Sequence, residues 1–419
     1  MASSDLLPVS GALAPRAPAP DVYTHTDALA ERYAALNLGR GAPDFDGPPV
    51  LRRAAAAAMR AGVNQYVPSA GHPELLATLG ALAVPAGTRY DPGTEITVTA
   101  GATEALATAL ETLLRPGDEV LMLEPFYDSY PALVRRAGGI PVPVPLVRRD
   151  GGYVLDADAV SAAVTARTRV LLLNTPHNPT GWVASAADLE ALGALVLRHG
   201  LYAVCDEVYE QLVHVQGQGP KQGEELGLGL DGGHRSIAAL PGLRERTIVC
   251  SGASKSLSVC GWRVGWAFAP AKLTGPLRDA HRMLSYCAPA PLQLGVAAGL
   301  AWAHRTGWFD VQRQEYLERR TALLAGLEAA GMRPVTPSGG FMIMASTGAA
   351  LPADPLRANE LLARDYGVTG LPLTGFHHRP EAADGLLRFA FCKEPGVLQE
   401  AARRLSALAP ATEKGTLPA

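Results

Sequence analysis

Between about residues 90 and 270, short apolar runs of strand length alternate with longer segments that have a helical period. The runs are ITVT, VLML, VLLL, YAVC, TIVC and VGWAF. They do not alternate apolar with polar positions, which is typical of strands buried on both faces. Helices between such strands imply a mostly parallel sheet covered on both sides. We therefore predict a large three-layer α/β domain with a mixed, mostly parallel sheet.

The run ITVT leads directly into GATEALATALETLL, in which Leu106, Leu110 and Leu113 fall on one helical face. The segment RPGD then ends the helix. Gly101, Ala102 and Thr103 would stand at the helix start, where unpaired N–H groups and the helix dipole favour a phosphate. A Gly-Ala-Thr turn also serves as an ordinary cap, so this pattern alone leaves both interpretations open.

From about residue 300 the order changes, because helical stretches precede the strand-like pieces GGFMIMAS and LLRFAF. This order predicts a smaller α+β domain. The Gly/Gln-rich stretch at residues 215–233 is typical of a surface loop. We expect a flexible Ala/Pro-rich arm at residues 1–20, followed by a segment at 21–45 that packs with the small domain. The large domain should then span residues 46–295, the small domain 296–410 and a disordered tail 411–419.

Composition narrows the function. With 419 residues, of which 48% are hydrophobic, the chain can build more than one sizeable core. Lys and Arg number 37 against 40 Asp and Glu, a formal net charge of −3, which gives no basic field for a nucleic acid or an anionic membrane. The five scattered cysteines form no CxxC pair, which argues against a disulfide framework or a metal site. The first twenty residues lack the pattern of a signal peptide. We therefore predict a cytoplasmic small-molecule enzyme without a metal.

Polar residues that abruptly end the apolar runs are candidates for chemistry, because ligands collect at the carboxyl ends of parallel strands. Asn178 lies in NTPHNPTG after VLLL, and DEVY after YAVC places Asp206 at a strand end with Tyr209 one turn on. Lys255 and Arg263 lie among small and apolar residues in SGASKSLSVCGWRVGW. Each alone has an ordinary structural role. Together, a phosphate cradle, a carboxylate, hydrogen-bonding Asn and Tyr and an imine-forming lysine match what pyridoxal 5′-phosphate requires.

Longer motifs then identify a family resemblance. The chain resembles the fold-type-I, class I/II aminotransferases, and most of all the branch that holds kynurenine, glutamine and methionine aminotransferases. The motifs that carry it cover most of the chain and run LNLGRGAPDF, NQYVPSAGHPEL, EPFYDSYP, LLNTPHNPTG, DEVYEQLV, SGASKSLSVCGWRVGWAFAP, PSGGF and LLRFAFCKE.

The resemblance implies roles around the cofactor ring. Lys255 is similar to the lysine that forms an imine with the cofactor and moves the substrate proton. Asp206 resembles the carboxylate that keeps the ring nitrogen protonated. Asn178 and Tyr209 are similar to the pair that hydrogen-bonds the phenolic oxygen. Phe126 resembles the ring stacked on the pyridine, although a core phenylalanine is equally common.

The resemblance also implies a phosphate site made by Gly101, Ala102, Thr103 and Arg263. Tyr66 matches a tyrosine that reaches the phosphate of the neighbouring subunit, which implies a homodimer. Gly252 replaces a frequent phosphate-binding serine, and Ser251 or Ser254 could take its place; we expect Ser251 among the cofactor residues.

Arg388 lies inside the apolar strand-like piece LLRFAF and therefore needs a partner. The resemblance implies that this partner is the substrate α-carboxylate, bound as a bidentate fork, and the alternative is an exposed arginine on an edge strand. By the same resemblance, Gly41 and Asn178 meet the carboxylate and Tyr23 lines the side-chain pocket.

Two positions depart from the family pattern near the substrate. Arg40 stands where the branch commonly has glutamine, so we expect one substrate to carry a second anionic group. Cys287 lies near the place where some relatives have an active-site histidine.

The resulting function is amino-group transfer from an α-amino acid to a 2-oxo acid by a ping-pong cycle. The alternative is a cofactor-dependent elimination, replacement or carbon–carbon bond-forming enzyme on the same scaffold, because the same lysine and aspartate would serve it. A transcription regulator built on such a domain would need a DNA-binding module ahead of it, and only about twenty residues precede the body.

Overall fold

The computed structural model describes residues 21–82, 88–149, 151–214, 234–349 and 351–408. The expected arm, surface loop and tail at residues 1–20, 215–233 and 411–419 lie outside the described residues. In the described ranges, no helix has both the length and the apolar character needed to cross a membrane.

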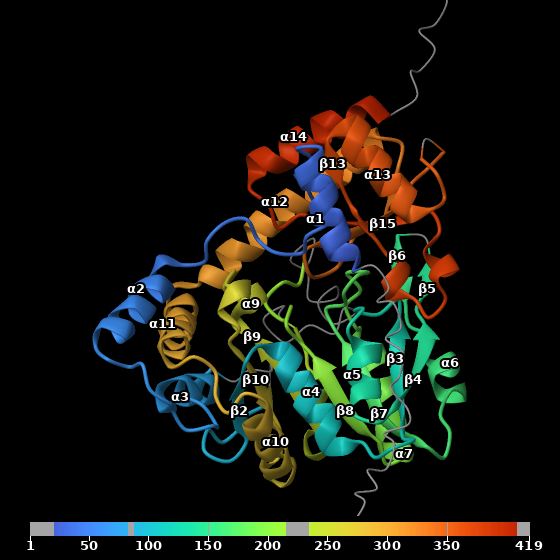
Figure 1. Cartoon of the computed structure of the whole chain (residues 1–419). Helices are drawn as coiled ribbons and strands as arrows, with labels where there is room; N and C mark the ends of the chain where they lie inside the picture. Colours follow the sequence, from blue (N-terminus) through green and yellow to red (C-terminus); the bar gives the residue numbers. More distant parts are fainter. Residues whose placement is uncertain (1–20, 83–87, 150, 215–233, 350, 409–419) are drawn as a thin grey trace, which may run out of the picture.

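A seven-stranded sheet forms the middle layer of the larger part of the molecule (Figure 1). Its strand order is β2-β10-β9-β8-β7-β3-β4, and β10 runs antiparallel to both neighbours while the other pairs are parallel. This arrangement confirms the predicted mixed, mostly parallel sheet. The strands are β2 Ile96–Thr99, β3 Glu119–Glu124, β4 Ile140–Pro145, β7 Thr168–Asn174, β8 Tyr202–Asp206, β9 Thr247–Gly252 and β10 Gly265–Phe268.

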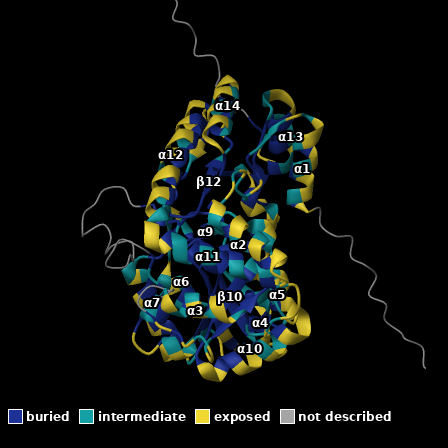
Figure 2. Ribbon diagram, turned by 90° about the vertical axis from the view of Figure 1, so that its left-hand side faces the viewer, coloured by how far each residue is buried: buried dark blue, intermediate teal, exposed yellow. Residues whose placement is uncertain are grey.

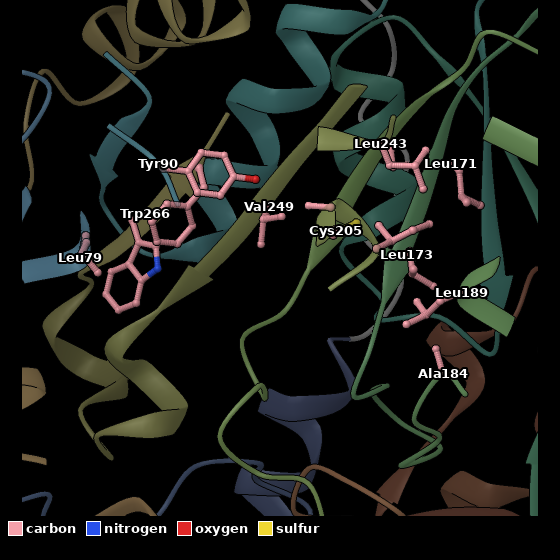
Figure 3. Packing of buried hydrophobic residues seen from close by; sticks show 14 of the residues in the cluster. Leu79, Tyr90, Leu171, Leu173, Ala184, Leu189, Cys205, Leu243, Val249 and Trp266 are labelled. Atoms are coloured by element: carbon pink, nitrogen blue, oxygen red, sulfur yellow. The ribbon is translucent and has the colours of Figure 1, made fainter. Parts of the chain in front are cut away.

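Helices cover both faces of this sheet, and alternate residues of one strand enter different cores. In β7, Val170 and Leu172 belong to the cluster beneath α4 Ala102–Leu113, α5 Tyr130–Arg136 and α10 Ala271–Leu284. Leu171 and Leu173 belong to the opposite cluster (Figure 3). That cluster is covered by α2 Pro49–Arg60, α3 Pro73–Ala81, α6 Ala157–Ala162, α7 Ala186–Arg198 and α11 Ala290–Thr306. Burial on both faces explains why the runs lack polar alternation, and Figure 2 shows the strands buried beneath helices that are exposed on their outer sides.

Strand β4 is the one strand of this sheet that the apolar runs did not predict. Its sequence IPVPVP places proline at every second position, and proline cannot donate a ladder hydrogen bond. The strand lies at the sheet edge and pairs only with β3. An edge tolerates prolines whose missing donors would face away from the neighbour.

A second sheet lies above the first in Figure 1, in the order β11-β12-β15-β14. Its strands are β11 Arg333–Pro334, β12 Met342–Ser346, β14 Leu371–Pro372 and β15 Leu386–Ala390, and its helices are α12 Trp308–Ala329, α13 Pro355–Tyr366 and α14 Pro395–Leu405. The N-terminal helix α1 Val22–Arg32 lies against α13, and β1 Leu36–Asn37 pairs in parallel with β13 Val368–Thr369. The exact domain boundaries stay a prediction.

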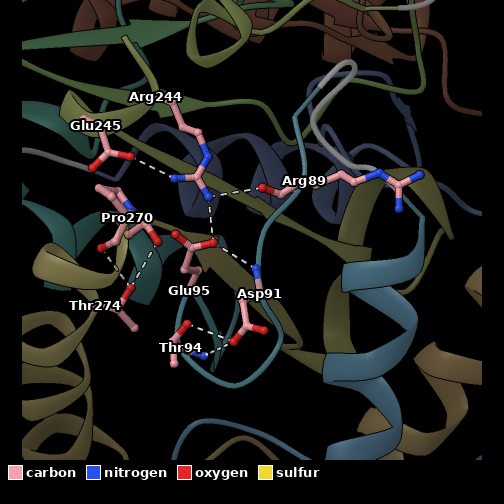
Figure 4. A network of polar contacts seen from close by, with 9 residues as sticks. Arg89, Asp91, Thr94, Glu95, Arg244, Glu245, Pro270 and Thr274 are labelled. Carbon is pink, nitrogen blue, oxygen red and sulfur yellow. Dashed lines mark hydrogen bonds and ion pairs between the residues drawn. The ribbon is translucent and has the colours of Figure 1, made fainter. Parts of the chain in front are cut away.

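Shorter elements complete the described chain. They are β5 Val147–Arg149, β6 Gly152–Val154, α9 Ala253–Ser256 and the 3-10 helices η1 Ile237–Ala239, η2 Arg244–Arg246, η3 Cys260–Trp262, η4 Thr374–Phe376, η5 Pro380–Ala383 and η6 Ser406–Leu408. Arg244 donates to Glu95 and to the carbonyl of Arg89 (Figure 4). These bonds tie the segment before β2 to the turn before β9.

The register brings one edge of the large sheet together as a site. Asn174 at the end of β7 is opposite Asp206 at the end of β8, and Asp206 is opposite Cys250 on β9. Because β10 is antiparallel, its first residue Gly265 pairs with both Thr99 and Gly252. The turns that follow β2, β7, β8 and β9 therefore meet at the same edge.

Candidate active site

A cleft of about 380 Å³ opens at this edge, between the large sheet and the second sheet. Most of the residues singled out from the sequence line it, although they come from segments far apart in the chain. They are Tyr23, Arg40, Gly41, Ala102, Thr103, Asn178, Asp206, Tyr209, Lys255, Arg263 and Arg388. Gly101 is the cap residue just before the first turn of α4.

Asp206 is the buried acid at the floor of the cleft. Its Oδ2 accepts a hydrogen bond from the Tyr130 hydroxyl at 2.7 Å, and its Oδ1 accepts one from the Val208 N–H at 3.3 Å. Burial raises the pKa of Asp206 to about 6, while the Tyr130 and Val208 hydrogen bonds and the charge of Lys255 act in the opposite direction. The Asn174 amide also donates to the Asp206 carbonyl at 2.9 Å. This carboxylate is held rigidly and would be stabilised by a cationic group in the cleft.

Lys255 lies on the short helix α9, directly after β9. Its Nζ donates to the Gly41 carbonyl at 3.1 Å and lies 3.8 Å from Cys260 Sγ. Aromatic rings surround it, with centroids 5.5 Å away for Phe341 and 6.0 Å away for Tyr209. Within the part of the chain that the structure describes, no carboxylate forms an ion pair with this amine. A lysine held among rings without a counter-ion is suited to act as a nucleophile.

The opposite end of the cleft is built to receive an anion. Helix α4 starts there, and the first N–H groups of a helix have no partner within it. Gly101 has φ +86°, and a Cβ at this position would lie 2.4 Å from Arg263 Nη2. The Arg263 guanidinium therefore packs directly over the glycine, next to Ala102. The unpaired N–H groups at the helix start, the helix dipole and the guanidinium together can bind a phosphate.

Arg388 enters the cleft from the second sheet. Its strand β15 lies between β12 and β14, and the side chain is only 1% exposed, so the alternative of an exposed edge-strand arginine is wrong. Nη1 donates to Asn178 Oδ1 at 3.0 Å and Nη2 to the Gly39 carbonyl at 3.1 Å. Nε has no hydrogen-bond partner among the described residues. A buried guanidinium with spare donors needs an anion, and a carboxylate matches its fork.

Two residues assigned to the cofactor from the sequence are not on the cleft lining. The Phe126 ring belongs to the hydrophobic cluster beneath α4, against which the adjacent Tyr127 also packs, and Tyr127 lines the cleft. The stacking role of Phe126 stays a prediction.

Ser251 is the second of these residues. Alternation along β9 turns its side chain away from α4, and its hydroxyl donates to Glu210 at 2.6 Å. Ser254, one turn later on α9, lines the cleft. Of the two serines that the sequence left open, Ser254 is therefore the one on the cleft lining.

Three residues occupy positions outside the interior of the cleft. Tyr66 is 82% exposed and packs edge-on against Tyr286, with 5.2 Å between ring centroids, so it does not reach the cleft of its own chain. Arg40 lines the rim, and its guanidinium pairs with Asp27 on α1. Cys287 is partly buried and is not on the cleft lining, whereas Cys260 is.

Sequence reasoning missed Tyr130, Tyr127 and the Gly39 carbonyl. The motif EPFYDSYP contains both tyrosines, but nothing in its spacing indicates which ring turns to the cleft or which hydroxyl reaches Asp206, 76 residues further along.

Comparisons with known proteins agree with this geometry. A family model described as "Aminotransferase class I and II" matches residues 34–405. A probable N-succinyldiaminopimelate aminotransferase of Mycobacterium tuberculosis is 40% identical over 402 residues, which cover 93% of this chain and 97% of that protein. The solved structure of the N-succinyldiaminopimelate aminotransferase from this organism has a TM-score of 0.85 at 41% identity, covering 93% of this chain and 97% of its own.

Two further relatives come from the branch that the motifs resemble. Kynurenine–oxoglutarate transaminase of Dictyostelium discoideum is 32% identical, and the alignment covers 91% of this chain and 92% of that protein. Methionine aminotransferase of Escherichia coli is 33% identical, with 92% of this chain and 95% of that protein covered.

Proposed function

The chain belongs to the class I and II aminotransferases and moves amino groups from amino acids to 2-oxo acids, and we propose that it does so with pyridoxal 5′-phosphate bound in the cleft. The observation that carries the proposal is the placement of Asp206, Lys255 and Arg263 around one cleft of about 380 Å³. The relatives named above are all aminotransferases, which favours transfer over the elimination or replacement alternative.

The residues present fit this cofactor. The first turn of α4 and Arg263 offer donors and positive charge to its phosphate. Asp206 is a buried carboxylate whose pKa burial raises to about 6, so a protonated ring nitrogen would relieve the cost of its charge. Asn178 and Tyr209 line the cleft between these two ends and can bond the phenolic oxygen.

When bound, pyridoxal phosphate supplies an aldehyde that bonds amines covalently and a ring that accepts electrons from the substrate Cα. Lys255 Nζ would hold that aldehyde, and as a free amine it would carry the proton from the substrate Cα. Arg388 binds and orients the α-carboxylate with its unused donors, assisted by Asn178 and the backbone of Gly41. Tyr127 lines the cleft and would cover one face of the ring, the role that the sequence suggested for Phe126.

Borohydride reduction tests the covalent attachment. The enzyme loaded with pyridoxal phosphate should become irreversibly labelled on the peptide that contains Lys255, and Lys255→Ala should abolish both the label and the spectral response to amino acids. Lys272→Ala is the matched control, because this lysine is more than half exposed on the surface. A label on any other peptide, or an unchanged spectrum with every amino acid supplied, contradicts the proposal.

We also propose that the active unit is a homodimer in which Tyr66 reaches the cofactor phosphate of the second copy. The support is the 82% exposure of Tyr66 and its ring contact with Tyr286, which is itself 44% exposed. Mixing a Lys255→Ala chain with a Tyr66→Ala chain should restore activity toward about a quarter of the wild-type sites, since one site in each hybrid is intact. Mixtures no more active than the separate variants would argue against shared sites.

For the substrate, we propose that one partner carries a second anionic group that Arg40 contacts. Arg40 lines the rim of the cleft beside Tyr23, and its present partner Asp27 is partly exposed and can be exchanged for a substrate anion. The M. tuberculosis relative is named for an amino acid with additional carboxylates. Arg40→Gln should raise KM for dicarboxylic amino acids and leave methionine unaffected; equal effects on both classes would refute the assignment.

A cytoplasmic location completes the proposal. All five cysteines are free in the structure, as expected for a reducing compartment. Non-reducing and reducing gels of protein from intact cells should show the same species, and a disulfide-linked form would contradict this location.

A further inference from the structure

A buried polar cluster lies directly behind the phosphate end of the cleft. His281 on α10 is 0% exposed, and its Nδ1 lies 2.9 Å from Glu104 Oε1 on α4. Its Nε2 lies 2.9 Å from the carbonyl oxygen of Ser69. Glu104 also accepts hydrogen bonds from the Ala100 N–H and from the Ser285 hydroxyl.

The two partners of the imidazole fix its protonation. A backbone carbonyl can only accept a hydrogen bond, and so can an ionised carboxylate. Burial alone would raise the pKa of Glu104, but the hydrogen bonds from His281, Ala100 and Ser285 outweigh burial and keep that pKa below its usual value. Glu104 is therefore ionised at neutral pH, and both ring nitrogens of His281 must donate.

From this geometry we infer that His281 is held as an imidazolium and is a positioning residue for the cofactor phosphate. The role toward the phosphate rests on the proposed function, whereas the protonation state of His281 does not depend on it. Glu104 lies in the first turn of α4, one residue after Thr103, so its negative charge stands close to the place where the phosphate is expected. The imidazolium neutralises that charge, and the Ala100 bond fixes the segment that leads into the helix.

The same imidazolium connects two parts of the expected dimeric site. Its Nδ1 bond holds α4, which forms the phosphate site of its own chain. Its Nε2 bond holds the loop at Ser69, three residues after Tyr66. His281 therefore links the helix that binds one phosphate to the loop that would serve the other subunit.

Other charged groups nearby face elsewhere. On α10, Arg278 donates to the Ile96 carbonyl at 2.7 Å, and Arg282 pairs with Asp279 at the surface. His72, on the loop after Ser69, accepts from the Glu74 N–H. Within the described residues, Glu104 is the charged side chain in contact with His281. Loss of the ring proton would leave a nitrogen lone pair facing Glu104 and expose its charge to the phosphate.

The protonation state is tested first, on apoprotein labelled with nitrogen-15 histidine. His281 is one of ten histidines, and the signal lost in His281→Gln identifies it. Because both partners of the ring are acceptors, both ring nitrogens should carry a proton in the wild type. In Glu104→Gln the new amide can donate to Nδ1, so the ring should become neutral with its proton on Nε2. A neutral ring in the wild type would overturn the inference.

The positioning role is tested by comparing pyridoxal phosphate with phosphate-free pyridoxal. His281→Gln leaves Glu104 uncompensated and should weaken pyridoxal phosphate binding by about tenfold or more, with pyridoxal affected less than about twofold. Adding Glu104→Gln to that variant should restore most of the affinity, because the charge is removed. Arg282→Ala, on the next residue of the same helix, is the control and should change neither ligand.

An equal loss for both ligands, or no rescue by the double variant, would overturn the positioning role. A protein that binds neither ligand would instead refute the proposed cofactor, while the ring-proton result would still stand.

Discussion

Replacing Arg388 by lysine separates the geometry of the guanidinium from its charge. The side chain is 1% exposed, and two of its nitrogens are already bonded to Asn178 and to the Gly39 carbonyl. Lysine keeps one positive charge but presents a single ammonium in place of the planar fork. The ammonium can donate to one of the two buried acceptors, so the variant should fold and bind the cofactor. Its affinity for the substrate α-carboxylate should be lower.

The magnitude follows from the hydrogen bonds at stake. A bidentate contact to a carboxylate becomes a single contact, and one charge-assisted hydrogen bond contributes about 1.5–3 kcal/mol. At about 1.4 kcal/mol for each factor of ten, kcat/KM should fall by about 10- to 150-fold. Arg388→Ala should fall further, because it also leaves Asn178 Oδ1 and the Gly39 carbonyl without their buried donor.

Half-reaction kinetics measure this loss directly. The variant is compared with the wild type on an amino acid and on the matching amine that lacks the α-carboxylate, with cofactor absorbance and thermal unfolding as controls for folding. The amino acid should show the full loss, and the amine should react at nearly equal rates with both proteins. The same fold-loss on the two substrates would refute the assignment of Arg388 to the carboxylate, and so would an unchanged kcat/KM with the amino acid.

Four further results test the rest of the site. Tyr130→Phe removes a hydrogen bond that lowers the pKa of Asp206. The decrease in pyridoxal phosphate affinity on acidification, expected near pH 6 for this carboxyl, should therefore begin at higher pH in the variant. An unchanged pH dependence would contradict the contact. Because burial raises that pKa from 3.8 to about 6, the contribution of Asp206 to apoprotein stability is fully present below pH 3.8 and is lost as pH rises through about 6, by ~3 kcal/mol at most; the difference between the unfolding curves of wild-type and Asp206→Asn apoprotein measures it. Gly101→Ala should weaken pyridoxal phosphate binding by about 1–3 kcal/mol, since φ is +86° and the new Cβ meets a guanidinium; unchanged affinity would show that the turn adapts. Tyr127→Ala should shift the cofactor absorbance and weaken binding by about 0.5–1.5 kcal/mol, whereas Phe126→Leu should change stability alone, and the reverse pattern would return the stacking role to Phe126.

Much of the fold follows from local pattern. The runs from ITVT to VGWAF all became strands of one sheet, because residues buried on both faces must be apolar at successive positions. Strand β4 was not predicted, because the prolines of IPVPVP are typical of segments that interrupt strands. The strand pairs because it lies at the edge of the sheet, and the edge position is known only from the assembled sheet. The antiparallel direction of β10 is likewise a property of the sheet and not of GWAF itself.

The sequence by itself determined the chemistry: a lysine, an acid, an arginine in an apolar strand and a helix start placed after strand ends, in motifs long enough to identify the family. Tertiary structure decided which neighbours serve them. The places of Tyr127 and Ser254 on the cleft lining depend on which way adjacent side chains turn. The contacts of Tyr130 with Asp206 and of Glu104 with His281 join residues 76 and 177 positions apart. Residue types and motifs can be identified from the sequence alone. Contacts between distant residues form only when the folded sheet, helices and turns fix the position of each side chain.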